Sequence, residues 1–351
     1  MRSRSSARFN TGMQQSLDLS VTKTRAERAL VFIEDPGLWL SVRAGELSLR
    51  QRDGRYIELS PKVKTIVAAG HGFAVTSAAI RHCSLRHIEL LISDDAAAFV
   101  SLFAPTSTVN SSRAALKVRE RQFRAAFDPA KTAATARAIV AAKVKMEGHA
   151  KVLERSFLTR LQQAKTTDDV RHAEAQAAQA FWRQFIGFEM RFAGPAPPAG
   201  WHRFTSRYIA RPQGRLGELG AQFTARGAVH PCQAVLNFAT AIVTARLTRV
   251  VIAHGLDPCF GFLHDGRKPG RLSLVWDCVE PLRPGIVRAV FEYVETHTFE
   301  KKDFLIFVHK TTGEKTVRLA PKLAKEITAL AIRTVSVREC VKAVNWMIKR
   351  L

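Results

Sequence analysis

The sequence predicts an α+β fold in which a small β-rich N-terminal domain precedes a larger, all-helical domain. Between residues 30 and 95, short apolar runs alternate with Gly, Pro and Asp turn signals, a spacing typical of strands. From residue 112 onward Ala, Arg, Lys and Gln dominate, and these residues favour helices. With 351 residues, of which 46% are hydrophobic, the chain can bury a core in two domains. The predicted segments are a basic flexible arm over residues 1–26, a β-rich domain over 27–105 and a helical domain over 106–351.

The predicted β-rich domain contains six short apolar runs. They lie at Leu30–Ile33, Leu38–Val42, Leu47–Arg50, Tyr56–Leu59, Thr65–Ala69 and Ile88–Ile92. Asp35-Pro36-Gly37 and Arg52-Asp53-Gly54 supply turns between them, and a short helix is predicted over Ser77–Cys83. A β-rich domain of this size exposes strand edges that need cover. We therefore expect it to form a homodimer.

The predicted helical domain is interrupted by several breaks. A linker rich in Ser, Thr and Asn comes first, over Pro105–Ser112, and helical composition then continues to about Phe192. Three prolines between Gly194 and Gly200 interrupt it, because proline lacks the N–H that a helix interior needs. The later elements expected are a helix over Cys232–His254, turns at Asp257-Pro258 and Lys268-Pro269-Gly270, helices from Ile286, and a hairpin over Phe304–His309 and Thr316–Leu319.

The charge balance points to a polyanionic partner. Lys and Arg number 54 against 30 Asp and Glu, a net charge of +24, and like charges repel one another in a compact state. Nucleic acid is the first candidate. An anionic membrane surface is the second, but it would need a basic amphipathic helix or a dense polybasic run. The positive charge is instead spread along the whole chain, which favours a broad DNA-binding groove.

Cysteine usage and hydropathy favour a cytoplasmic protein without a membrane partner. The five cysteines are scattered and form no C-x-x-C pair, which argues against a disulfide framework and a zinc site. The longest apolar region, Val235–Leu256, is interrupted by Arg246 and Arg249, so a buried helix is expected there rather than a membrane span.

The N-terminal arm has three interpretations. Its first 24 residues are rich in Ser and Arg, with Asp18 the only acid. A transit peptide has this composition, and so does a disordered basic arm that touches DNA. The third interpretation is a terminus without a role.

Four residues stand out as candidates for chemistry: Glu174, His264, Asp277 and Glu280. Glu174 lies in an Ala-rich helical stretch, and His264 ends an apolar run. Asp277 and Glu280 are three residues apart, so a helix starting there would place both on one face. Phosphodiester chemistry needs such a set, because a divalent metal neutralises charge on the attacked phosphate and the departing oxygen. Carboxylates suit Mg²⁺, and imidazole is more acceptable to Mn²⁺.

Each of these residues also has an ordinary explanation. Glu174 alone could be a solvated helix-face glutamate, and His264 a partly buried histidine. Asp277 could cap a helix N-terminus. Glu280 could oppose a nearby arginine such as Arg283.

Two ordered motifs resemble those of the CRISPR-associated adaptation integrases. Gly255-Leu-Asp-Pro-Cys-Phe-Gly-Phe-Leu-His264 is similar to the family's G-L-D-P-x-x-G-F-L-H. Ser273-Leu-Val-Trp-Asp-Cys-Val-Glu-Pro-Leu-Arg-Pro284 is similar to S-L-x-x-D-L-x-E-x-x-R-P. Upstream, Glu174-Ala-Gln-Ala-Ala-Gln-Ala-Phe-Trp182 resembles E-G-x-A-A-R-x-Y-W, while Arg119-x-x-Gln122 and Ala142-Lys143 fit the family's first helices. The resemblance covers about residues 27–320.

The resemblance implies a fold and an activity. Members combine a β-rich domain that dimerises with a helical catalytic domain, and join foreign DNA fragments into a repeat array through a free 3′ hydroxyl. Glu174, His264 and Glu280 match the residues that hold the family's metal, expected here as Mg²⁺ or Mn²⁺, and Asp277 matches an acid beside it. Double-stranded DNA with free 3′ ends and a dimer of a small CRISPR-associated adaptor protein are the implied partners.

Several positions depart from the family pattern. Ala175 and Gln179 replace a glycine and an arginine of the glutamate helix. His230-Pro231-Cys232-Gln233 replaces D-P-x-N before the long apolar helix, and Arg288 replaces an aspartate. None of these changes removes an expected metal ligand.

Basic residues near the expected site are candidates for DNA contacts. They are Lys143, Arg207, Arg226, Arg267, Lys268, Arg271 and Arg283. The segment Trp201–Arg215 also interleaves aromatics with arginines. Its side chains could stack on splayed bases and bind phosphates, or its aromatics could belong to the core below a solvated face.

Three functions remain open from the sequence. The first is the integrase that the resemblance implies. The second is a stand-alone DNA nuclease or transposon-type integrase with the same chemistry. The third is a non-catalytic basic DNA-binding scaffold, which the presence of all four candidate site residues disfavours, because a decayed site should have lost at least one.

Overall fold

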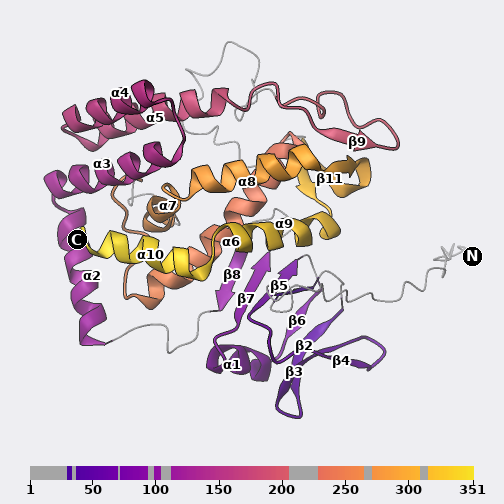
Figure 1. The fold of residues 1–351 in the computed structure, drawn as a ribbon. Coiled ribbons are helices and arrows are strands. Elements are labelled where there is room, and N and C mark those ends of the chain that lie inside the picture. Colours follow the sequence, from indigo (N-terminus) through magenta and orange to yellow (C-terminus); the bar gives the residue numbers. More distant parts are fainter. Residues whose placement is uncertain are drawn as a thin grey trace, which may run out of the picture.

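The computed structural model describes residues 30–33, 37–69, 72–93, 99–103, 112–204, 228–264, 271–308 and 315–351. A β-rich region forms one end of the molecule, and a larger helical region covers the rest (Figure 1). This arrangement confirms the predicted α+β fold. The predicted basic arm over residues 1–26 and most of the predicted linker lie outside the described residues.

The described residues of the β-rich region form two four-stranded sheets. The first has the order β1 (Leu30–Ile33), β5 (Thr65–Ala69), β7 (Glu89–Ser93) and β8 (Phe99–Phe103), and the second has the order β4 (Tyr56–Glu58), β3 (Glu46–Arg50), β2 (Trp39–Arg43) and β6 (Ala74–Val75). Helix α1 (Ser77–Leu85) begins at a Thr76 cap and confirms the predicted short helix. All six predicted runs contain a strand, while β6 and β8 were not predicted. The first sheet is parallel except for its β7–β8 pair.

In the part of the chain that the structure describes, the helical region begins with four helices and ends with five more. They are α2 (Arg113–Ala126), α3 (Pro129–Met146), α4 (Lys151–Gln163), α5 (Thr167–Arg183), α6 (Pro231–Ala253), α7 (Ser273–Val279), α8 (Arg283–Thr296), α9 (Pro321–Thr334) and α10 (Val337–Ile348). The first helical block ends at Arg183 instead of near Phe192, because Phe192 lies in strand β9 (Arg191–Ala193).

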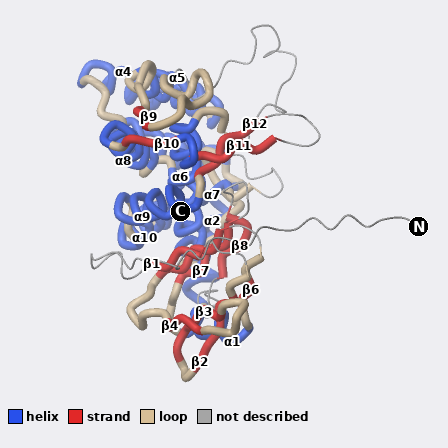
Figure 2. The backbone as a smooth tube through the Cα atoms, turned by 90° about the vertical axis from the view of Figure 1, so that its right-hand side faces the viewer, coloured by secondary structure: helices blue, strands red, loops and turns tan. Residues whose placement is uncertain are grey.

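Two small sheets accompany the helices. Strand β9 pairs in parallel with β10 (Thr298–Glu300), a contact between distant segments that the sequence did not predict. Strands β11 (Phe304–Val308) and β12 (Lys315–Leu319) pair antiparallel and confirm the predicted hairpin. Figure 2 shows the strands of the β-rich region toward one end of the molecule and this hairpin extending from the helical region, where β12 contacts α6.

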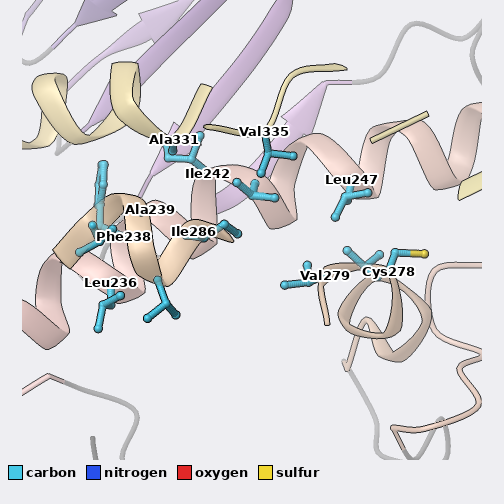
Figure 3. Packing of buried hydrophobic residues seen from close by; sticks show 14 of the residues in the cluster. Leu236, Phe238, Ala239, Ile242, Leu247, Cys278, Val279, Ile286, Ala331 and Val335 are labelled. Atoms are coloured by element: carbon cyan, nitrogen blue, oxygen red, sulfur yellow. The ribbon is translucent and has the colours of Figure 1, made fainter. Parts of the chain in front are cut away.

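Helix α6 is the centre of the core. Side chains from α7, α8 and α9 converge on it, as the labelled residues in Figure 3 show. It is long and apolar enough to cross a membrane by length and composition, but 61% of that stretch is buried inside the molecule. This burial confirms the predicted core helix.

The β-rich region shares this core. Phe32, Val67 and Leu91, on three strands of the first sheet, belong to the same buried cluster as α6. A separate cluster lies between the two sheets and α1. The first sheet therefore packs on both faces, which explains why the middle residues of its central strands, Ile66 to Ala68 and Leu90 to Ile92, are all apolar.

Candidate active site

Glu174 lies in the middle of α5, at the edge of a cavity. A capping box of Thr166 and Asp169 fixes the start of this helix. The small side chains Ala173 and Ala177 are buried, so α5 can pack closely on its neighbour α3. The Glu174 side chain is 26% exposed, and it contacts the Lys143 ammonium of α3. It is therefore not a freely solvated helix-face glutamate.

The loop Gly255–His264 carries the candidate histidine and is held by side chains from distant helices. Buried Gln122 donates from Nε2 to the carbonyls of Asp257 and Phe260, both at 2.8 Å. Its Oε1 accepts the N–H of Asp257 at 2.8 Å. Arg171 Nε donates to the carbonyl of the residue before His264, at 2.8 Å. The sequence had predicted no role for Gln122 or Arg171, because no local pattern shows contacts that span 135 positions for Gln122 and 92 for Arg171.

Asp277 is fully buried and organises the end of this loop. Its Oδ2 accepts the backbone N–H of Phe262 at 2.5 Å and of Leu263 at 3.1 Å. Its Oδ1 accepts the backbone N–H of His264 at 3.0 Å and lies 2.7 Å from that residue's Nδ1. Asp277 sits inside α7, which begins at Ser273, so the predicted helix start at Asp277 was wrong. The apolar run before Asp277 is itself helical, and Asp277 binds the loop instead of capping a helix.

Gly261 allows the loop to approach α7 this closely. A Cβ atom at this position would lie 2.8 Å from Oδ2 of Asp277 and 2.7 Å from the backbone carbon of Ser273. A side chain here would therefore displace the carboxylate from the backbone N–H groups that it binds.

Glu280 lies directly after α7 and is 3% exposed. Its Oε2 is 2.8 Å from Lys143 Nζ, and its Oε1 is 3.1 Å from Arg283 Nη2 and 3.8 Å from His264 Nε2. Burial acts to raise the pKa of Glu280, but the nearby charges of Arg283, Lys143 and His264 outweigh it and lower the pKa to about 2. Glu280 does oppose Arg283, and it also belongs to a larger cluster.

Lys143 links the two glutamates. Its side chain is buried, and its ammonium contacts both Glu174 and Glu280. Burial acts to lower the pKa of Lys143, but attraction by Glu280 and Glu174 exceeds this effect and raises the pKa. The ammonium thus lies where two carboxylates converge, a position suited to a cation.

Lys143 lies between two of the side chains that the sequence predicted as metal ligands. Glu174 and Glu280 offer carboxylate oxygens, and the ring of His264 turns Nε2 toward Glu280. Among the described residues no three His, Cys, Asp or Glu side chains are already arranged as a metal-binding group. The Lys143 ammonium contacts two of the three expected ligands, Glu174 and Glu280. It carries a positive charge at the place where a metal cation is expected.

A cavity of about 1060 Å³ opens beside this cluster. The cavity is lined by the candidate site residues Glu174, His264 and Glu280 and by the basic residues Arg171, Arg271 and Arg283. Its wall also includes Trp182 of α5 and Ile186, which follows that helix. Its arginines offer charged hydrogen-bond donors of the kind that contact phosphates.

The structure brings together every described residue predicted for the site. Three predicted DNA contacts, Lys143, Arg271 and Arg283, line the cavity. Arg207, Arg226, Arg267 and Lys268 lie outside the described residues. Trp201 and Phe204 are buried, so these two aromatics belong to the core, which was the second interpretation of their segment.

Comparison with known sequences identifies a family. The profile described as CRISPR associated protein Cas1 matches residues 31–330. A CRISPR-associated endonuclease Cas1 from Francisella tularensis subsp. novicida is 24% identical over 277 residues, which cover 74% of this chain and 77% of that protein. One from Korarchaeum cryptofilum is 42% identical over 66 residues, only 19% of each chain.

Solved structures share the fold. A casposase bound to integration product superimposes with a TM-score of 0.70 at 19% identity, covering 92% of this chain and 91% of that one. A Cas1 protein from Thermotoga maritima has a TM-score of 0.67 at 17% identity, with 91% and 96% covered.

Proposed function

Because the chain belongs to the Cas1 family of CRISPR-associated proteins, we propose that it is a metal-dependent DNA endonuclease and integrase. It joins short foreign DNA fragments into a CRISPR repeat array by attack of a 3′ hydroxyl on a phosphodiester. The observation that carries this proposal is the convergence of Glu174, His264 and Glu280 on one cavity with basic walls. The names of the curated relatives, CRISPR-associated endonucleases, support it.

Glu174, His264 and Glu280 would hold one Mg²⁺ or Mn²⁺. Such an ion would neutralise charge on the attacked phosphate and on the departing oxygen. Three protein ligands would leave room for substrate groups, whereas a closed site would be structural.

Asp277 positions the histidine for this role. Its carboxylate accepts a hydrogen bond from His264 Nδ1, which leaves Nε2, on the side of Glu280, as the nitrogen that would be offered to a metal. The three backbone N–H groups that Asp277 also accepts fix the ring relative to α7. Arg271 and Arg283, on the cavity wall, would bind the phosphates flanking the reacting bond.

Double-stranded DNA and a Cas partner complete the proposed assembly. The net charge of +24 supports a large phosphate contact. Solved structures with this fold include the casposase with its integration product and a Cas6-RT-Cas1–Cas2 complex, which has a TM-score of 0.65 at 13% identity. Dimerisation through the β-rich region, and a small adaptor dimer as partner, are part of the proposal. A stand-alone nuclease or transposon-type integrase would carry out the same chemistry without that partner.

The test is a strand-transfer assay with a short duplex bearing free 3′ ends, a supercoiled target and Mn²⁺. Glu174→Ala, His264→Ala and Glu280→Ala should each lower joining by at least about 10³-fold, the scale of losing an essential catalytic group. Duplex binding should change little, because it rests on the basic surface. Glu120→Ala, which removes an exposed acid of α2, serves as the control. Joining at the wild-type rate by all three site variants would exclude this assignment.

A further inference from the structure

Lys143 is a buried cation placed between two proposed metal ligands. It is 4% exposed, and its ammonium contacts Glu174 and lies 2.8 Å from Oε2 of Glu280. A divalent ion held by the same two carboxylates would meet this ammonium at short range, and like charges at such distances repel strongly in a buried site. Metal binding therefore requires the ammonium to move.

The ammonium cannot move without a new partner. A buried charge left unpaired costs several kcal/mol, and the Lys143 side chain has little access to water. An acceptor that is buried, close to Lys143 and not already used would remove this cost.

Glu147 meets these conditions. It lies one helical turn after Lys143, at the C-cap of α3, where side chains four positions apart are neighbours. It is 1% exposed. Its Oε2 lies 2.7 Å from His149 Nε2, whereas its Oε1 is buried without a hydrogen-bond partner among the described residues.

The electrostatics of Glu147 agree with this role. Burial raises the pKa of Glu147, and the hydrogen bond from His149 and the charge of Lys143 oppose that rise. The Lys143 charge is thus already felt at Glu147. An ammonium that moved onto Oε1 would satisfy a buried oxygen that otherwise costs free energy.

We propose that Lys143 is an internal counter-ion that occupies the metal position, and that it moves onto Oε1 of Glu147 when a divalent ion binds between Glu174 and Glu280. The inference rests on the proposed function, since it takes those glutamates as ligands. Lys143 is then a positioning residue, which holds the two carboxylates together without metal and competes with the metal for them. Glu147 and His149 form the receiving pair.

Mn²⁺ binding to the full-length protein, measured by calorimetry and by electron paramagnetic resonance, tests this exchange independently of activity. Lys143→Met removes the competing charge at similar volume, so Mn²⁺ should bind at least about 10-fold more tightly, since the protein no longer has to release the ammonium. The metal-free melting temperature should fall by about 5–10 °C, because buried Glu280 and partly exposed Glu174 lose their shared cation. Added Mn²⁺ should restore it.

Glu147→Gln tests the receiving end. It keeps the shape and removes the charge, so Mn²⁺ should bind about 10-fold more weakly, because the displaced ammonium has no carboxylate to receive it. This variant removes a buried charge with one unpaired oxygen, and we expect it to fold without metal. Lys145→Met, a neighbouring lysine of α3 that lines a different groove, is the control and should leave Mn²⁺ affinity unchanged.

The outcomes separate this inference from the proposed function. Unchanged or weaker Mn²⁺ binding by Lys143→Met would overturn the exchange, provided that the wild-type protein binds Mn²⁺ and Glu280→Ala does not. Unchanged binding by Glu147→Gln would overturn its role as the receiving carboxylate. A wild-type protein that binds no Mn²⁺ would overturn both the exchange and the metal-dependent function.

Discussion

Two buried clusters of carboxylates and cations lie in different parts of this molecule. In one, Glu89 of β7 meets Arg246 and Arg249 of α6, with distances of 3.3 Å and 2.8 Å. In the other, Glu280 meets Lys143 and Arg283, at 2.8 Å and 3.1 Å. Both carboxylates are buried, so burial and charge pairing do not distinguish them.

Their surroundings distinguish them. Glu89 also accepts the Thr65 hydroxyl at 2.8 Å, and Arg246 donates to the carbonyl of Val335 at 3.0 Å. This cluster therefore joins the first sheet to α6 and to the end of α9. Glu280 instead faces a cavity together with an imidazole and a second carboxylate. The comparison teaches that a buried ion pair alone does not indicate a reactive site. A cavity that substrate can enter, with several potential ligands facing it, is the better indication.

The largest expected effect on folding belongs to the Glu89 cluster. Glu89→Gln leaves buried Arg246 and partly buried Arg249 without their carboxylate, so the free energy of unfolding should fall by about 3–5 kcal/mol. Denaturant unfolding measures this change, and Mn²⁺ affinity should stay as in the wild type. Glu58→Gln, on exposed β4, should change stability by less than about 0.5 kcal/mol. A loss below 1 kcal/mol for Glu89→Gln would show that this cluster does not join the two regions.

His230 is a buried titratable group of a different kind, because its imidazole is neutral at pH 7 and has no charged partner in either cluster. It caps α6 by accepting the N–H of Cys232, where the family pattern has an aspartate. Burial lowers its pKa to about 4. Between pH 6.5 and 4 the unfolded chain binds a proton here and the folded chain does not, so stability falls as the pH drops through this window.

This loss should reach about 3 kcal/mol, from the 1.36 kcal/mol that each pKa unit represents. Unfolding of the wild type and of His230→Asn, which retains a capping oxygen, should be compared at pH 7 and pH 4. The wild type should lose more stability than the variant. Equal losses would mean that His230 titrates normally in the folded protein.

The smallest of these effects concerns Asp277, a buried carboxylate that acts through another residue. Asp277→Asn places an N–H₂ group where an acceptor is needed for the Nδ1 proton of His264 or for the backbone. The imidazole should then be misoriented, and Mn²⁺ affinity should fall by about 10- to 100-fold. Calorimetric titration measures it, and a thermal melt shows whether the fold is kept. Unchanged Mn²⁺ affinity would indicate that Asp277 serves only the loop backbone.

Much of the fold followed from local patterns. Six strands, the first helix, the core helix and the late hairpin lie where apolar periodicity and turn residues predicted them. The order of the two regions followed from composition. The β9–β10 pair was missed because parallel strands far apart in the chain leave no local signal.

The sequence by itself determined which residues could form the site, through the three motifs that carry Glu174, His264, Asp277 and Glu280. Only the tertiary structure decided their relationships: that Lys143 lies between the glutamates, that Asp277 binds the His264 loop, and that Glu147 keeps an unpaired oxygen. It also decided that Glu89 and Arg246, 157 positions apart, meet inside the protein. The physical reason is that periodicity and propensity act over a few residues, whereas a buried charge finds its partner through the packing of the whole chain.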